Sequence, residues 1–180
     1  MNTGCTASFL TAPALLAITG LAAGCGSAPP QVPYGIPAAI AAPAGQVAFL
    51  RTEASGVQVY ECAAPAGQAP AWVFKGPEAT LTGRSGASAG KHYGGPTWEG
   101  LDGGKVVGEV KASVPSPDAA AIPWLLLARK STSGMGAFIE TRSIQRIDTR
   151  GGKAPERGCD AAGAGRVERV PYTATYIYYR

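Results

Sequence analysis

The chain has 180 residues, which is enough for one domain with a short appendage. It is 46% hydrophobic and 16% charged, and its 16 Lys and Arg and 12 Asp and Glu residues all lie after Leu50. Residues 51–180 therefore have the charge density of a soluble globular domain, and this split excludes both a uniformly disordered chain and a multi-pass membrane protein.

The first 24 residues have the pattern of an export signal. Residues 9–24 are apolar or small apart from two threonines and Pro13, a run too short for a membrane span but typical of a signal peptide. Small residues directly precede Cys25, which resembles the lipobox of bacterial lipoproteins. We therefore expect residues 1–24 to be a lipoprotein-type signal peptide and Cys25 to be acylated. Because Leu21 stands four residues before Cys25 instead of three, an ordinary secretory signal and a secreted protein remain the alternative.

The Pro/Ala-rich residues 25–45 have too few large side chains to form a core, and we expect them to form a tether. The tether would join a membrane-bound lipid on Cys25 to a domain over residues 46–180. Glycine and serine, not aspartate, follow Cys25, and by analogy with sorted lipoproteins this indicates the outer membrane or periplasm of the cell envelope. In an exported domain Cys62 and Cys159, which lack metal-type spacing, predict one disulfide.

Short apolar runs separated by Gly, Pro, Ser and Asp clusters predict strands throughout the domain. In two of these runs apolar and polar residues alternate. In the second of the two, we expect one buried face to contain Val106, Val110, Ala112 and Val114. Two runs are continuously apolar, as in strands buried on both faces, and the last run is rich in aromatic and β-branched residues. In chain order these runs are 56–62, 71–74, 105–114, 124–128 and 173–179. The pattern predicts an all-β fold, a single antiparallel β-sandwich or β-barrel, and leaves open whether the sheet closes.

Several blocks in fixed order resemble the domain of unknown function 3455 family of secreted bacterial and fungal proteins. They are Gly56–Cys62, Lys91–Glu99, Ala121–Leu126, Ile144–Arg146, Gly151–Pro155, Gly158–Asp160 and Val170–Tyr176. The resemblance covers roughly residues 36–180 and implies an exported β-rich domain whose two cysteines pair, with no assigned chemistry. Some fungal members are labelled malate dehydrogenase. This chain has no G-x-G-x-x-G after a strand and no βαβ alternation, so we expect neither a nucleotide nor another cofactor.

His92 is the only histidine, so any catalysis that needs a near-neutral base would use it, with Glu99 or Asp102 to orient the ring. No G-x-S-x-G nucleophile motif is present. With the cysteines paired, one histidine and scattered carboxylates are too few for zinc, and we expect no metal site.

Tyr93 and Trp98 lie among turn glycines and are candidates for the rim of a ligand site, with Glu99 supplying hydrogen bonds. Trp72 and Trp124 stand inside apolar runs, and we expect them in the core. The ligand would be a small molecule or a polysaccharide.

The sequence contains no motif of a known nucleic-acid-binding fold, and we do not expect an exported domain of this kind to bind nucleic acid. The sequence therefore favours an envelope protein that binds a ligand or has a structural role. A small hydrolase that uses His92 with a carboxylate is the alternative.

Overall fold

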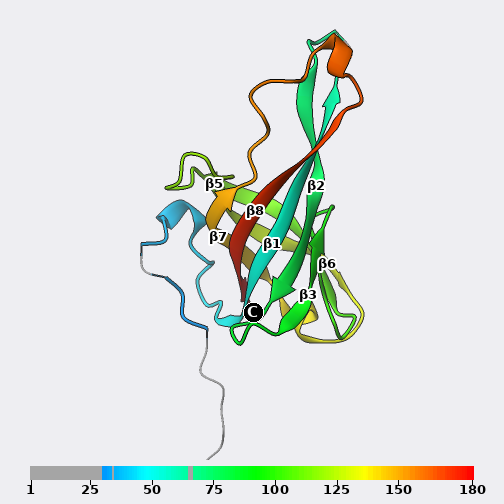
Figure 1. The fold of residues 1–180 in the computed structure, drawn as a ribbon. Coiled ribbons are helices and arrows are strands. Elements are labelled where there is room, and N and C mark those ends of the chain that lie inside the picture. The colour runs from blue at the N-terminus through cyan, green and yellow to red at the C-terminus, as the bar shows by residue number, and fades with distance from the viewer. Residues whose placement is uncertain (1–29, 34, 65–66) are drawn as a thin grey trace, which may run out of the picture.

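The computed structural model describes residues 30–33, 35–64 and 67–180, and the export signal and Cys25 lie outside these residues. Eight strands and three short 3₁₀ helices make up the described chain (Figure 1). None of these helices is long and apolar enough to cross a membrane. In chain order the elements are η1 (Ala38–Ile40), β1 (Ala48–Ala63), β2 (Ala71–Thr82), β3 (Ser88–Tyr93), β4 (Thr97–Gly100), β5 (Lys105–Val114), β6 (Trp124–Ser133), η2 (Ala137–Glu140), β7 (Ser143–Gly151), η3 (Ala161–Gly163) and β8 (Val167–Tyr179).

The strands form a closed antiparallel barrel. Each strand pairs with the next one in the chain, and β8 returns to pair with β1 along most of its length. The prediction of an antiparallel all-β domain is confirmed, and of the two architectures left open the chain adopts the barrel. Closure leaves no unpaired sheet edge in the barrel, and an eight-stranded barrel has an interior just wide enough for side chains or one small ligand.

The two-residue period of β8 divides its apolar residues between two cores. Tyr172, Ala174, Tyr176 and Tyr178 belong to the inner core of the barrel, with Trp98, Leu127 and other residues of facing strands. Ile177 and Tyr179 alternate with them and belong to a second cluster on the outer surface of the barrel. This explains why the end of the chain is apolar at nearly every position.

The segment before β1 covers this outer cluster. Ile40 of η1 is fully buried against the cluster that holds Ile147 and Ile177, and its carbonyl accepts a hydrogen bond of 2.6 Å from Gln145 Nε2. Figure 1 shows the segment, in blue, beside β5 and β7. The last part of residues 25–45, which we expected to be tether, therefore packs on the barrel, because Ile36 and Ile40 supply the large apolar side chains that the rest of that stretch lacks.

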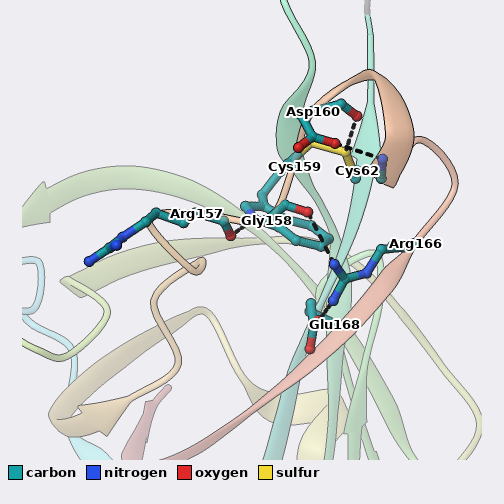
Figure 2. The surroundings of a disulfide bond; sticks show 9 residues. Cys62, Arg157, Gly158, Cys159, Asp160, Arg166 and Glu168 are labelled. Atoms are coloured by element: carbon teal, nitrogen blue, oxygen red, sulfur yellow. Dashed lines mark hydrogen bonds and ion pairs between the residues drawn. A yellow bond between two sulfur atoms is a disulfide. The ribbon is translucent and has the colours of Figure 1, made fainter.

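At one end of the barrel β1, β2 and β8 continue into an arm, which projects at the top of Figure 1. The predicted disulfide is confirmed: Cys62 near the end of β1 is bonded to Cys159 in the β7–β8 connection. Figure 2 shows Arg166 beside it, where its guanidinium donates to the Gly158 carbonyl and pairs with Glu168 at 2.8 Å. The disulfide thus ties the connection to the tip of the arm.

The opposite end of the barrel is closed by η2. Phe138 of this helix is 3% exposed and packs edge-on against Tyr178, with ring centroids 5.0 Å apart. Gly100 lies so close that a Cβ on it would be 3.0 Å from the Phe138 ring. The end that carries the arm has no such plug in the described residues.

Two strand predictions need correction. The run 71–74 is not buried on both faces, because it lies on the arm beyond the barrel, and Phe74 there is 51% exposed. In β5 the four predicted residues do not share a face. The register shifts between Val110 and Ala112, so Val106 lies in the inner core whereas Ala112 and its neighbour Val114 contact the outer cluster.

Candidate ligand-binding site in the barrel

The barrel contains a cavity of about 370 Å³ at the end that carries the arm. All eight strands contribute to it, together with the β3–β4 turn and the β5–β6 connection. The residues around it are Gln58, Tyr60, Phe74–Pro77, His92, Gly95, Pro96, Trp98, Val110, Ile122, Pro123, Leu125, Leu127, Arg146 and Tyr176. Its size and mostly apolar walls with a few polar groups are those of a small-molecule site.

The β3–β4 hairpin places His92 and Trp98 on the cavity wall. The two residues are direct cross-strand partners, so their side chains leave the sheet on the same face, toward the interior. Their rings are stacked, with centroids 4.3 Å apart. Space for the indole depends on Gly108 of β5, where a Cβ would lie 3.0 Å from Trp98 Cζ3. Trp98 is therefore 1% exposed and forms part of the wall, not the rim that its glycine-rich surroundings suggested.

The environment of His92 keeps its imidazole neutral. Nδ1 donates a hydrogen bond of 2.8 Å to the Thr97 carbonyl, which fixes the tautomer and leaves Nε2 as an acceptor. Burial lowers the pKa of His92 to about 3, against the opposing effect of that hydrogen bond, and the positive charge of Arg146 lowers it further. A base of this pKa is poorly matched to general acid–base catalysis at neutral pH.

Glu99 lies on the opposite face of the hairpin from His92. It pairs with Lys91 at 3.5 Å and Lys105 at 3.3 Å, and accepts a hydrogen bond of 2.8 Å from the Tyr93 hydroxyl. The hydrogen bond from Tyr93, followed by the two ammonium groups, holds the pKa of Glu99 below its ordinary value. Tyr93 and Glu99 thus belong to an outer polar cluster, away from Trp98.

Asp102 lies in the β4–β5 turn, at the plugged end of the barrel. Its carboxylate accepts hydrogen bonds from the backbone N–H of Gly104 at 3.0 Å and of Ala137 at 3.1 Å. This joins the turn to η2. The structure therefore brings neither Asp102 nor Glu99 to His92. Nor do three His, Cys, Asp or Glu side chains gather as a metal site anywhere in the described chain.

The two outer tryptophans differ from each other. Trp124 at the start of β6 is half-buried and packs against the outer cluster that contains Ile40, not in the inner core of the barrel. Trp72 is only half-buried on the arm, where its Nε1 donates a hydrogen bond of 3.1 Å to the Arg157 carbonyl. Neither of them lines the cavity.

Arg146 of β7 supplies a positive charge to the cavity. Its Nε and Nη2 both donate to the Pro123 carbonyl, at 3.1 and 2.8 Å, which holds the guanidinium at the cavity wall. No carboxylate lies within 4.0 Å of this guanidinium in the described part of the chain. Its charge acts against the burial that raises the pKa of the Tyr176 hydroxyl.

Other polar groups of the cavity walls are also unsatisfied. Gln58 Nε2, Trp98 Nε1 and the Tyr176 hydroxyl are buried and have no hydrogen-bond partner among the described residues. A buried polar group without a partner costs about 1–3 kcal/mol, and such groups are uncommon in folded proteins. Three of them on the walls of one cavity indicate a place that a ligand or ordered water completes.

The sequence pattern does not identify Gln58, Arg146 or Tyr176 as site residues. In the sequence Arg146 is one of several basic residues interleaved with acidic ones, and its separation from them requires the fold. One weak signal of a charge on the barrel wall is that Arg146 directly follows Ile144 and Gln145, both buried, in a segment without turn residues. The two-residue period of their strands assigns the side chains of Gln58 and Tyr176 to one face of the sheet. It cannot show that this face lines a cavity.

The comparisons with known proteins identify the family of this barrel. No curated protein and no solved structure matches the chain. The model of one family, described as protein of unknown function (DUF3455), matches residues 43–180, which include all eight strands and every residue around the cavity. The chain therefore belongs to the DUF3455 family, whose name assigns no activity.

Proposed function

We propose that this protein is a binding protein of the bacterial cell envelope, anchored by a lipid on Cys25, whose barrel cavity holds one small, largely apolar molecule. The cavity carries the proposal, because it combines apolar walls from all eight strands with buried polar groups that lack partners. A cavity of about 370 Å³ within the barrel suits a small molecule better than a polysaccharide chain.

The mouth of the cavity supports entry of an apolar ligand. Phe74 and Val110 are 51% and 50% exposed, although both belong to the set of residues around the cavity. Phe74 is held by an aromatic contact with Tyr60, with ring centroids 5.5 Å apart. Exposed apolar side chains at the opening of an apolar cavity are typical of ligand-binding grooves.

The hydrolase alternative gains no support from the geometry. His92 is buried and stacked on Trp98, and its Nδ1 hydrogen bond goes to a backbone carbonyl, not to a carboxylate. A purely structural role does not account for the buried polar groups of the cavity that lack hydrogen-bond partners.

The binding proposal is tested with 2-acetylnaphthalene, a neutral probe of a size suited to the cavity. Calorimetric titration of the purified domain is expected to show saturable binding of one molecule. Val110→Trp should block the opening and weaken binding at least about tenfold, a loss on the order of 1.4 kcal/mol. Val167→Trp is the matched control, because Val167 is 55% exposed and lies on the arm away from the cavity walls. Absence of saturable binding both of this probe and of its carboxylate analogue 2-naphthoate, or equal weakening by both variants, contradicts the proposal.

Location is tested separately. The leader before Cys25 and the disulfide, which forms in oxidising compartments, support export. The intact mass of protein extracted from cell membranes should correspond to a chain that begins at an acylated Cys25. An unmodified chain that begins elsewhere would refute the lipid anchor without affecting the cavity.

A further inference from the structure

We infer that the ligand of the barrel cavity is a small organic carboxylate, and that Arg146 binds its carboxylate group. The inference rests on the proposed binding function and adds the chemical class of the ligand. It depends on the charge of the cavity, on the kind of polar group left unsatisfied there, and on the shape of the remaining space.

The cavity has a positive charge with no counter-ion among the residues that the structure describes. The residues around it include Arg146 but no Asp or Glu, and Lys75, the other cation there, pairs with Glu61 at 3.0 Å. By contrast, Arg51, Arg166, Arg169 and Arg180 each pair with a glutamate. Arg146 is half-buried, so its charge is less screened by water than those of the surface arginines.

The unsatisfied polar groups at the cavity are mainly donors. Gln58 Nε2 and Trp98 Nε1 can only donate, and the Tyr176 hydroxyl can donate as well as accept. Together with the guanidinium of Arg146 they match a group that is negative and rich in acceptor oxygens. A ligand with a donor group at this position would leave these hydrogen atoms unpaired.

Among anions, a carboxylate fits best. A single guanidinium balances one negative charge, and its planar donors match the two oxygens of a carboxylate. A phosphate carries up to two charges and would place one of them uncompensated among apolar walls. Since Nε and one N–H of Nη2 are already directed to the Pro123 carbonyl, the Nη1 group and the second N–H of Nη2 are left for the two oxygens of the ligand.

The rest of the cavity defines the body of the ligand. Leu125, Leu127 and Ile122 line it together with Trp98 and Tyr176. The volume of about 370 Å³ corresponds to roughly a dozen water molecules at liquid density. One or two fused rings or a short branched chain fill such a space, whereas a long-chain fatty acid does not.

The experiment compares two probes of equal size, 2-naphthoate and the neutral 2-acetylnaphthalene, by calorimetric titration near neutral pH. The wild-type protein should bind naphthoate roughly ten- to a hundredfold more tightly than the ketone, as expected for hydrogen bonds to a charged group. Arg146→Gln should remove this preference by weakening the binding of naphthoate, while the affinity for the ketone changes by less than about threefold. Arg146→Lys, which keeps the charge but not the fork of donors, should retain part of the preference.

Arg142→Gln is the matched control, because it removes the same charge from an exposed residue outside the cavity. It should leave the preference unchanged, and thermal unfolding checks that each variant is folded. The wild-type comparison of the two probes stands even if Arg146→Gln does not fold. Equal wild-type affinity for both probes, or a preference that survives Arg146→Gln, overturns the inference and leaves the cavity-binding proposal intact. Failure of both probes to bind contradicts the proposed function itself.

Discussion

The imidazole of His92 lies nearly parallel to the indole of Trp98, with 13° between the ring planes and 4.3 Å between the centroids. Tyr176 meets both rings edge-on, at centroid distances of 5.0 and 5.2 Å. Three strands, β3, β4 and β8, thus join in one aromatic cluster at the wall of the cavity. The cluster gives the only histidine of the chain a packing role in place of a titrating one.

This arrangement predicts that His92 stays neutral at physiological pH. Burial lowers its pKa to about 3, so its ring should not gain a proton between pH 8 and pH 5. Proton NMR should find the Cε1–H resonance of His92 constant over this range. A titration near pH 6.5, the ordinary value for histidine, would refute the prediction and reopen a catalytic role.

The same pKa predicts how stability depends on pH. The unfolded chain binds a proton at His92 near pH 6.5 and the folded chain near pH 3, so this contribution to stability is complete above pH 6.5 and is lost as the pH falls toward 3. Urea unfolding should be measured for the wild type and His92→Gln at pH 7 and pH 4.5. Between these two pH values the free energy of unfolding of the wild type should fall by about 2–3 kcal/mol more than that of the variant. Equal losses in the two proteins would count against a buried neutral His92.

Removal of the disulfide should destabilise the protein strongly. Cys62 and Cys159 are 97 residues apart, and closing a loop of that length stabilises a fold by about 4–5 kcal/mol in the chain-entropy model. Urea unfolding of the Cys62→Ala, Cys159→Ala double variant should show a loss of this order, and the reduced wild type should behave in the same way. A loss below about 1 kcal/mol would mean that the arm opens independently of the barrel.

The segment before β1 should contribute to the stability of the barrel. Ile40 is fully buried against the outer cluster, and its truncation to alanine should cost about 2–5 kcal/mol. Val32, which is 41% exposed on the same segment, provides the control, because Val32→Ala should change stability by less than about 0.5 kcal/mol. Similar small effects at both positions in chemical unfolding would show that the segment is only loosely held.

The strand content and the disulfide could be predicted because both depend on local pattern or composition. The run 105–114 matches β5 at both ends, and the two cysteines of the domain pair as expected. Strands β3, β4 and β7 escaped prediction, the first two because they are short and contain or border glycines, which are typical of turns. For the same reason Trp98 was assigned to a rim although it lies in the inner core.

The cavity could not be predicted because it depends on pairings between distant parts of the chain. Closure of the barrel requires β1 to pair with β8, and nothing in the local pattern of either strand specifies the other. The register shift beyond Val110 turns the rest of β5 to the outer surface, which no two-residue period anticipates. The isolation of Arg146 from every described carboxylate likewise follows only from the assembled walls.

The most direct test of cavity binding is to locate a bound probe. Intermolecular nuclear Overhauser effects between 2-acetylnaphthalene and the isotope-labelled domain should involve Leu127, Trp98 and Tyr176 on the cavity walls. The same signals should disappear in Val110→Trp, which blocks the opening. Contacts confined to the arm or to the outer surface, or none at saturating probe, would contradict the account of this barrel as a small-molecule binding protein.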